Sequence, residues 1–590
     1  MRCQVGEDVG YSVRFDEAVS AKTRIKFLTD GMLLREALLD PLLSNYSVIM
    51  VDEAHERSLS SDILLGLLKK VQKQRQELKI VVSSATIDAE RIADFFRDDN
   101  AKDPDDQCKI VALAGRSYPV DIQYLDRPSE DYVTTAVETA ITIHKEEAVG
   151  DILIFLTGRD EIQKALELLT DYSRTTLPNQ QALQPLPLYA GLDQNSQMYV
   201  FSPPAENTRK VILSTNVAEA SVTIDGIVYV IDCGYVKLRT YNPTTNIETL
   251  TRVPVSQASA TQRAGRAGRT KPGKCYRLYT SAAFSSLLRT TSPEIQRTNL
   301  APTILQLKAL GIDNVAQFPY LTPPPARLMA RGLETLYSLG ALDDYAKLTK
   351  PLGTRMAELA VQPMMAKALL ASTTSEYNCV NEILTIAAMC SLQSAGQGGG
   401  IWFDHEGQRK AMELSRRKFA AEEGDHLTYL NVFQAFVGKG KRDQRWCHQH
   451  HLNHTALSRA VSIRAQLRRY LERFGYKIPD LDTSSSQQHE TVVPDNTTRV
   501  LKCLTSGYFM NVARMNPMDG TFRPLTASKQ NSITMHAHPT SLMFNRKADY
   551  VLFHELLETG DKVYIKDISK IDKSWITELG GSYYRVKDAR

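Results

Sequence analysis

Two adjacent carboxylates and a histidine follow the first strongly apolar run of the chain. Asp52, Glu53 and His55 come directly after residues 46–51, whose sequence YSVIMV is typical of a parallel strand buried on both faces. In an open α/β sheet, ligands bind at the carboxyl edge of the strands, so we expect both acids at that edge. Such a pair suits nucleotide hydrolysis, in which one acid holds Mg²⁺ through water and the other orients or deprotonates the attacking water. A solvated acid pair at a strand end is the alternative.

A second candidate site lies well downstream, between two predicted strands. The octapeptide at 262–269, QRAGRAGR, contains three arginines and two glycines. Glycine lets the backbone come close to a ligand, and guanidinium groups bind phosphate oxygens in a bidentate manner. This composition predicts arginines that reach the γ-phosphate of a nucleoside triphosphate. A generic basic loop is the alternative interpretation.

Alternating strand-like and helix-like segments would position these groups. The β-branched runs that predict strands are 46–51, 80–83, 152–156, 211–213 and 227–231, and a helix is predicted at 159–169. This alternation is typical of an α/β fold with a parallel sheet. From about Pro293 the apolar period becomes 3.6, which predicts helices, including one at 455–474 that ends at Gly475. A polar stretch at 483–498 predicts a linker, and strands at 550–557 and 562–568 predict a final β domain.

Composition restricts the class of protein. At 590 residues the chain has room for about four domains. Hydrophobic residues at 43% and charged residues at 23% exclude a wholly disordered chain. With 71 Lys and Arg against 67 Asp and Glu, nucleic-acid binding has to come from local patches. The eight cysteines form no C-x-x-C pair, which argues against a disulfide framework, and no apolar run approaches the roughly 20 residues of a membrane span.

Five motifs, in order, make the chain resemble the DEAH-box RNA helicases of superfamily two. Besides DEAH and QRAGRAGR they are Thr29-Asp-Gly31, Ser84-Ala-Thr86 and Thr215-Asn-Val-Ala-Glu-Ala-Ser221. The resemblance implies an α/β fold with two RecA-like lobes, the first incomplete, followed by a winged helix, a helical ratchet bundle and an OB-fold β-barrel. The implied domains are 1–120 (partial first lobe with the DEAH motif), 121–291 (second lobe), 292–360 (winged helix), 361–482 (ratchet) and 483–590 (linker and OB-fold).

The resemblance implies roles for the first-lobe residues that match the family's motifs. Asp52 and Glu53 would hold Mg²⁺ through water and activate the attacking water, and His55 would link the nucleotide site to the second lobe. Ser84 and Thr86 would couple hydrolysis to movement between the lobes.

In the second lobe, Gln262, Arg266 and Arg269 would reach the γ-phosphate of ATP. Phe201 would stack on the adenine, and Asp225 would lie near the ribose. Core packing for Phe201 and a strand-end turn for Asp225 are the alternatives.

Other matching residues would touch the sugar-phosphate backbone of RNA. They are Thr29, Gly31, Gly158, Arg159, Thr215 and Asn216. Backbone contacts carry no base information, so we expect binding that ignores sequence and depends strongly on salt. Residues 236–253 fit the strand-separating hairpin of related enzymes, with an ordinary surface hairpin as the alternative. Residues 439–477 hold ten Lys or Arg against two acids, which suits either a groove for single-stranded RNA or a solvated helix face.

The phosphate-binding motif of the family, G-x-x-x-x-G-K-[ST], does not occur in the 590 residues. The Gly-Lys pairs at 273–274, 438–439 and 440–441 are followed by Cys, Gly and Arg. In the family this motif precedes the segment that matches 10–15. We therefore expect either a truncated gene model, splice product or expressed fragment of a full helicase, or a natural form that binds RNA or proteins without hydrolysing ATP. The intact Mg²⁺ acids and arginines favour the first.

The resemblance implies an ATP-dependent RNA helicase that uses ATP and Mg²⁺ and moves 3′-to-5′ on single-stranded RNA. Residues 232–243 and 418–425 look closest to the spliceosome-associated branch, which implies pre-mRNA splicing and a nuclear location, with ribosome biogenesis as the alternative. Spliceosomal proteins and a G-patch activator are the implied protein partners, and no membrane partner is expected. The histidines near Cys447 do not have the spacing of a common zinc site.

Overall fold

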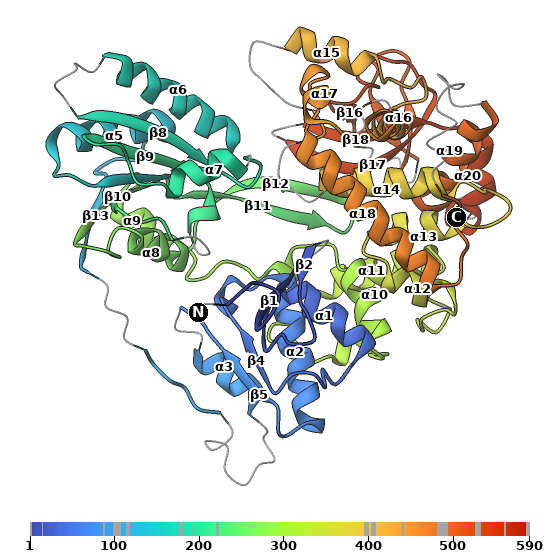
Figure 1. Ribbon diagram of the computed structural model, residues 1–590, viewed down its shortest axis with the longest axis horizontal. Helices are drawn as coiled ribbons and strands as arrows, with labels where there is room; N and C mark the ends of the chain where they lie inside the picture. The colour runs from blue at the N-terminus through green and yellow to red at the C-terminus, as the bar shows by residue number, and fades with distance from the viewer. Residues whose placement is uncertain are drawn as a thin grey trace.

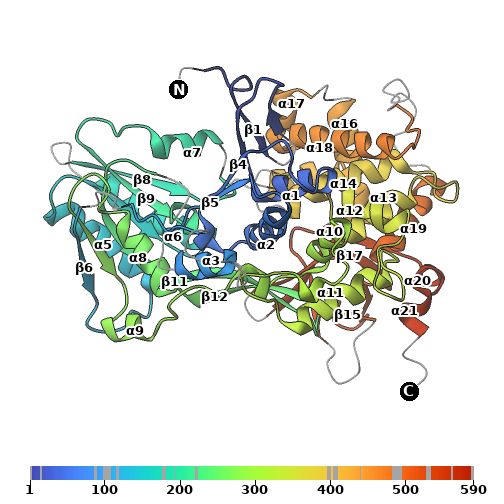
Figure 2. The ribbon, with the colours of Figure 1, turned by 90° about the horizontal axis from the view of Figure 1, so that it is seen from below.

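The computed structural model describes most of the chain and arranges it in three groups of elements (Figure 1). The described residues are 3–13, 16–85, 89–97, 108–113, 118–175, 181–192, 194–219, 223–394, 400–402, 409–438, 440, 442–480, 494–525, 533–559 and 562–585. Seen from below, the N-terminal elements lie in front, between the second lobe on the left and the C-terminal regions on the right (Figure 2).

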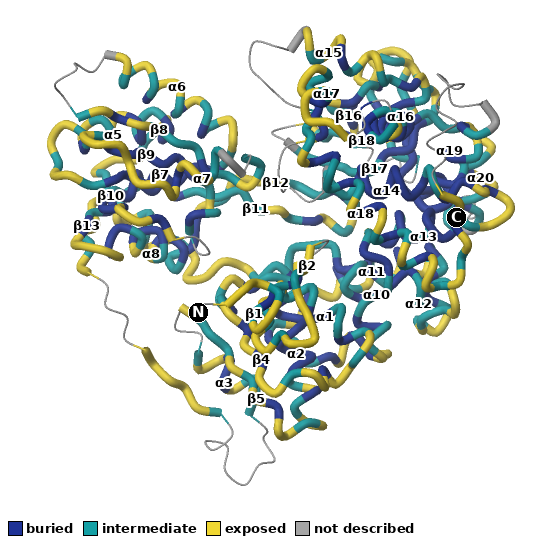
Figure 3. The backbone as a smooth tube through the Cα atoms, in the orientation of Figure 1, coloured by how far each residue is buried: buried dark blue, intermediate teal, exposed yellow. Residues whose placement is uncertain are grey.

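A six-stranded parallel sheet forms the centre of the second lobe. Its strands are β6 (Val120–Tyr124), β7 (Asp151–Phe155), β8 (Ala182–Leu188), β9 (Thr208–Ser214), β10 (Ile227–Asp232) and β13 (Gly273–Arg277), in the order β6-β13-β10-β7-β9-β8. The predicted runs at 152–156, 211–213 and 227–231 correspond to the three strands β7, β9 and β10, which are buried almost throughout (Figure 3).

Helices cover both faces of this sheet. Helices α5 (Tyr132–Glu146) and α6 (Arg159–Thr175) pack on one face, and α7 (Gln194–Phe201) and α8 (Gln257–Gly265) pack on the other. Successive side chains of a strand point to opposite faces, so Ile154 joins the core under α5 and α6 while Phe155 joins the core under α7 and α8. The lobe is therefore a doubly covered α/β sheet, as its sequence pattern predicts.

The N-terminal elements form two small sheets beside helices. Strands β1 (Val9–Val13), β2 (Asp16–Ala18) and β3 (Ile25–Leu28) make one sheet, and β4 (Val48–Val51) pairs in parallel with β5 (Lys79–Val82) in the other. Helices α1 (Asp30–Leu39), α2 (Leu59–Gln74) and α3 (Ala89–Phe96) accompany them. The prediction that 46–51 is buried on both faces is wrong, because Val48 and Met50 are 57% and 61% exposed. Only alternate residues of β4 pack into the core, as in a sheet covered on one side.

Helices make up the next region, as the change of period predicts. The first three are α10 (Ala301–Ala309), α11 (Ala326–Ser338) and α12 (Leu352–Glu358). The region 361–482, predicted as the ratchet region, contains α13 (Pro363–Ala371), α14 (Val380–Ser394), α15 (Arg409–Arg417), α16 (Asp425–Val437), α17 (Gln444–Gln449) and α18 (His454–Arg473). Helix α18 matches the predicted helix at 455–474, and Gly475 has φ +88°, as expected of a glycine that ends a helix.

A closed five-stranded barrel completes the chain. Its strands are β14 (Val512–Met515), β15 (Phe522–Pro524), β16 (Met535–Ala537), β17 (Tyr550–Thr559) and β18 (Lys562–Lys570), and β18 pairs back with β17 to close it. Helix α19 (Pro494–Tyr508) precedes the barrel, and α20 (Lys573–Leu579) and α21 (Gly581–Arg585) follow it. The predicted linker at 483–498 is wrong at its end, because 494–498 begin α19 and Thr497 is buried. Residues 483–493 lie outside the described part of the chain.

A long hairpin connects the second lobe to the barrel. Strands β11 (Tyr235–Asn242) and β12 (Ile247–Pro254) pair along their whole length, as the segment 236–253 predicts. At its far end β12 pairs in parallel with β17, through Glu248 with Leu557 and Thr249 with Glu558 (Figure 1). Among the described residues, none of the helices combines the length and the apolar character that crossing a membrane requires.

Candidate nucleotide and RNA site between the lobes

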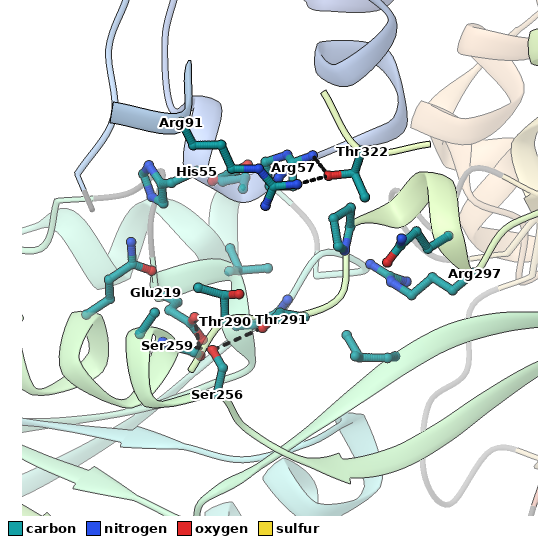
Figure 4. A pocket seen from close by; sticks show the side chains of 18 residues that line it. His55, Arg57, Arg91, Glu219, Ser256, Ser259, Thr290, Thr291, Arg297 and Thr322 are labelled. Atoms are coloured by element: carbon teal, nitrogen blue, oxygen red, sulfur yellow. Dashed lines mark hydrogen bonds between the residues drawn. The ribbon is translucent and has the colours of Figure 1, made fainter. Parts of the chain in front are cut away.

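A cavity of about 550 Å³ lies between the N-terminal elements and the second lobe. Its lining includes His55, Asn216 and Gln262, which belong to three of the sequence motifs. In Figure 4, His55 and Arg91 lie on one side of this space and Glu219 lies on the other. The fold therefore brings the DEAH segment and the QRAGRAGR segment to the same place.

The DEAH acids lie at the carboxyl end of β4, where the sequence predicts them. The Asp52 carboxylate accepts a hydrogen bond from the backbone N–H of Glu53 at 2.9 Å. The next residue, Ala54, donates its N–H to the carbonyl of Ser83 at 3.0 Å, so the segment follows the end of the neighbouring strand β5. Glu53 has φ +50° and a side chain that is 44% exposed. Exposed carboxylate oxygens are the ligands that Mg²⁺ prefers, so Asp52 and Glu53 fit the predicted metal.

His55 joins Glu53 to the segment that follows β5. Its side chain is only 6% exposed, and its Nε2 lies 3.3 Å from Oε2 of Glu53. Its Nδ1 accepts the backbone N–H of Ala85 at 3.2 Å. Because Nδ1 is an acceptor, the proton of a neutral ring lies on Nε2 and points to Glu53. The hydrogen bonds of His55 thus stay within the first lobe, beside Ser84. Thr86, its predicted partner in coupling, lies outside the described residues.

The arginines of QRAGRAGR fall into two environments. Arg263 is fully buried and pairs with Asp232 at 2.7 Å and with Glu219 at 2.9 Å. Burial by itself would lower the pKa of Arg263, but these two carboxylates raise it above its usual value. Arg263 therefore holds the lobe together, while the three residues predicted to reach the γ-phosphate lie nearer the surface.

Arg266 lies between its own lobe and the charge of Glu53 in the first lobe, although it does not line the cavity. Its guanidinium donates to the carbonyl oxygen of Glu219. Burial lowers the pKa of Arg266 to about 10, the charge of Arg269 adds to this effect, and the carboxylate of Glu53 opposes it. Arg269 is exposed and donates to the hydroxyl of Thr223. Glu53 of one lobe is thus close enough to act electrostatically on Arg266 of the other.

The two residues predicted to bind adenosine lie elsewhere on the second lobe. Phe201 ends α7 and is 49% exposed, so its ring is available to stack on a base. Lys210 holds the end of α7, since its Nζ donates to the carbonyl oxygens on either side of Phe201 at 2.8 Å. Desolvation lowers the pKa of Lys210, and the carboxylates of Asp151 and, to a smaller extent, Asp225 oppose this shift. Within the described part of the chain, neither Phe201 nor Asp225 lines the cavity.

The predicted RNA contacts are divided between several places. Thr29 and Gly31 line a second cavity of about 410 Å³, whose lining also includes residues of α10 and most of the segment 356–363. Asn216 lines the first cavity, and the neighbouring Thr215 donates its N–H to the carbonyl of Leu188 at 3.2 Å. The remaining two, Gly158 and Arg159, lie at the start of α6, where Arg159 is exposed.

Gly158 lies against the hairpin. A Cβ atom at this position would come within 2.8 Å of Nζ of Lys237, a residue of β11. The start of α6 and the hairpin therefore present Arg159 and Lys237 on neighbouring segments.

Sequence reasoning missed the groups that fix the first lobe to the segment before α11. Arg57 pairs with Asp62 at 2.7 Å and also donates to the hydroxyl of Thr322 at 2.8 Å. Arg91 donates to the same hydroxyl at 2.8 Å (Figure 4). The only signal is an arginine two residues after His55, and no pattern connects it to a threonine 265 residues later.

Several arginines of the basic segment 439–477 have partners within the ratchet region. Arg464 is buried and donates to Thr385 at 3.0 Å and to Asn381 at 2.8 Å. Arg468 pairs with Glu472 at 2.7 Å and with Asp480 at 2.8 Å. These contacts favour the helix-face interpretation of this segment over an RNA groove.

Comparison with known protein families identifies four regions of the chain. Residues 135–271 match the helicase conserved C-terminal domain, and 332–361 match the winged-helix part of the helicase associated domain (HA2). Residues 362–429 match its ratchet-like part, and 500–583 match the oligonucleotide/oligosaccharide-binding (OB)-fold. These matches agree with the predicted order of the fold.

Whole-chain relatives carry the same assignment. The chain is 47% identical to the human "Probable ATP-dependent RNA helicase DHX35", over 98% of this chain and 80% of the relative. Its identity to the Caenorhabditis elegans DHX35 homolog is 45%, over 99% of this chain and 76% of the relative. It is 40% identical to the Schizosaccharomyces pombe "Pre-mRNA-splicing factor ATP-dependent RNA helicase prp22", over 100% of this chain and 47% of the relative. The chain therefore belongs to the DEAH-box RNA helicases.

Proposed function

We propose that this protein couples ATP hydrolysis to 3′-to-5′ movement on single-stranded RNA during pre-mRNA splicing. The observation that carries the proposal is the cavity that is lined by both His55 of the first lobe and Gln262 of the second. The fission yeast relative is a pre-mRNA-splicing factor by name, which supports a role in splicing. A nuclear location, spliceosomal partner proteins and a G-patch activator belong to the same proposal.

In the proposed mechanism, the γ-phosphate of ATP lies between Glu53 and Arg266. Glu53 accepts a hydrogen bond from the attacking water and then takes its proton, while Nε2–H of His55 keeps the carboxylate in position. Arg266, Arg269 and Gln262 donate to the oxygens on which negative charge develops. Mg²⁺, held through water by Asp52 and Glu53, would supply further neutralisation of the phosphate charge. Lobe closure would be communicated through Ser84 and its neighbours, which adjoin His55 through Ala85.

The same proposal places RNA across both lobes. Thr29 and Gly31 would hold one stretch of backbone, and Arg159, Thr215 and Asn216 would hold another. Phe201 and Asp225 would bind adenine and ribose. We retain 1–120, 121–291, 292–360, 361–482 and 483–590 as the proposed domain limits.

RNA-stimulated ATP hydrolysis tests the catalytic proposal. The reading frame upstream of Met1 is first read for G-x-x-x-x-G-K-[ST], and a gene product that carries this motif is assayed beside Glu53→Gln. Loss of a general base is expected to lower kcat by about 10²- to 10⁴-fold. Glu77→Gln, an exposed glutamate of the same lobe, is the matched control and should keep full activity. Normal turnover in Glu53→Gln would remove Glu53 from the mechanism.

A second candidate function is an RNA- or protein-binding scaffold that does not hydrolyse ATP. The observation that favours it is the lack of G-x-x-x-x-G-K-[ST] in these 590 residues, while the second lobe, the helical region and the barrel all fold. The purified 590-residue chain is then expected to bind single-stranded RNA and to show little ATP hydrolysis. Robust hydrolysis by this chain would exclude the scaffold.

A further inference from the structure

Three metal-binding side chains meet where the ratchet region packs on the barrel. Cys390 comes from α14, His426 from the first turn of α16 and His554 from β17. One ligand atom from each lies within 4.8 Å of the other two. Cys390 and His426 are 1% and 0% exposed, and His554 is partly buried.

Both imidazoles present a buried nitrogen that has no hydrogen-bond partner among the described residues. For His426 this is Nε2, because its Nδ1 lies 2.9 Å from the hydroxyl of Ser569. For His554 it is Nδ1. A buried polar atom without a partner costs stability, so such atoms call for an explanation. Metal binding is a common explanation for such a nitrogen, because a histidine that binds a metal through one nitrogen is usually oriented by a hydrogen bond at the other. For His426, the hydroxyl of Ser569 is the partner in that hydrogen bond.

We propose that Cys390, His426 and His554 form a zinc site that leaves one coordination position open. A thiolate and two imidazoles are ligands of the kind that zinc prefers, and three protein ligands with a fourth open position is an established geometry for this ion. At zinc–sulfur and zinc–nitrogen distances of about 2.3 and 2.0 Å, tetrahedral ligand atoms are roughly 3.4–3.6 Å apart. Since the three atoms lie within 4.8 Å of one another, they would approach by at most about 1.4 Å when the ion binds.

The surrounding charges suit such an ion. One thiolate leaves a net positive charge on zinc. The carboxylates of Asp567, Glu555 and Asp425 act electrostatically on Cys390, and the cation of Lys566 opposes them; Asp567 and Asp425 are buried. Oδ2 of Asp567 is itself buried without a hydrogen-bond partner among the described residues. A cation beside these acids would reduce the cost of burying them.

A neighbouring cavity offers room for the fourth ligand. His554 lines a space of about 270 Å³ together with Tyr508 and Asn511. The hydroxyl of Tyr508 and Oδ1 of Asn511 are both buried and, within the described structure, lack hydrogen-bond partners. A water molecule at the open position would give these atoms partners. The ion would tie α14 and α16 of the ratchet region to β17 of the barrel.

Metal titration of the whole chain tests this site. Protein treated with a chelator is titrated with Zn²⁺ in competition with a chromophoric chelator, and Co²⁺ is used as the spectroscopic probe. We expect one Zn²⁺ per chain, a sulfur-to-cobalt charge-transfer band and a higher Tm when Zn²⁺ is added. Cys390→Ser and His554→Gln should each weaken binding by at least about 100-fold, and Cys390→Ser should abolish the band.

Cys447→Ser is the matched control, because Cys447 is also buried and lies near histidines but does not belong to the cluster. It should keep the affinity and the cobalt spectrum of the parent chain. Binding that is unchanged in Cys390→Ser, or a Co²⁺ spectrum of the parent chain without a sulfur band, would overturn the proposal. The second result does not depend on whether any variant folds.

Discussion

At the scale of single residues, the two contacts of the His55 ring indicate what this side chain does. It lies between the carboxylate of Glu53 and the backbone of Ala85, with one ring nitrogen toward each. In the proposed mechanism Glu53 faces the attacking water, and a displacement of about 1 Å can cost around 100-fold in rate. We therefore propose that His55 positions Glu53 in this mechanism.

We predict that His55→Ala lowers kcat for RNA-stimulated ATP hydrolysis by about 100-fold in a form of the protein that hydrolyses ATP. The KM for ATP should change little, because His55 has no predicted contact with the nucleotide. His448→Ala, an exposed histidine on α17, should leave both constants unchanged. An increase in KM with normal kcat would show that His55 contributes to binding instead.

The arginines of QRAGRAGR are predicted to respond differently to substitution. Arg263→Ala leaves the buried Asp232 and the partly buried Glu219 without their cation, which is expected to lower the free energy of unfolding by about 3–5 kcal/mol. Arg269→Ala removes an exposed side chain and should leave stability nearly unchanged while it lowers ATP turnover. Urea denaturation and ATPase assays of the two variants separate these outcomes. Equal destabilisation by both would contradict the division between structural and phosphate-binding arginines.

At the scale of elements, the ratchet region docks on the barrel through a close approach of two backbones. Gly424 has φ +130°, and a Cβ atom there would lie 2.2 Å from the carbonyl oxygen of Ile568 on β18. The neighbouring Asp425 caps the same contact, since its carboxylate accepts the N–H groups of Leu542 and Ile568, both at 2.8 Å. Only glycine fits this position.

Gly424→Ala is predicted to lower the Tm, because it adds a collision to a backbone strain of about 1–3 kcal/mol. Gly475→Ala is the matched control, since Gly475 has φ +88° but no heavy atom within 4 Å of the added Cβ. Scanning calorimetry of the two variants should give a clearly larger loss for Gly424→Ala. Similar losses would mean that the contact with β18 adjusts at no cost.

The elements also show what the sequence can and cannot predict. Strands β7, β9 and β10 are found from sequence because both of their faces are buried and nearly every residue is apolar. Strand β8 contains Pro185 and Pro187 and lies at the edge of the sheet, so its composition argues against a strand although its backbone pairs with β9. The place of the DEAH acids can be predicted because they come directly after a strand. Thr322 becomes part of the site only through tertiary packing, which the sequence does not reveal.

At the scale of the whole molecule, the predicted RNA contacts are spread over both lobes, and few of them are charged. Arg159 is the one cation among the six predicted residues, and it is exposed at the start of α6. Each phosphate contact on a single strand contributes about 0.7 to the slope of log affinity against log salt. The electrostatic contribution of Arg159 to RNA affinity can therefore be measured from the salt dependence of binding.

We predict that Arg159→Ala weakens binding of unrelated single-stranded RNAs of equal length by the same factor and reduces the salt slope by about 0.7. Fluorescence anisotropy at several salt concentrations measures both quantities. Arg174→Ala, at the other end of α6 and paired with Asp171, should change neither. An effect that depends on base sequence would show that Arg159 reads bases and does not simply contact phosphate.

The parallel pairing of β12 with β17 also limits how the lobes can move. This pairing joins the hairpin and the barrel in one hydrogen-bonded sheet of seven strands, which connects the second lobe to the C-terminal barrel. When the second lobe rotates, either the barrel must move with it or the hydrogen bonds at Glu248 and Thr249 must break. That ladder is only two residue pairs long. The mechanical connection between the second lobe and the barrel can therefore be broken and formed again while both the hairpin and the barrel stay folded.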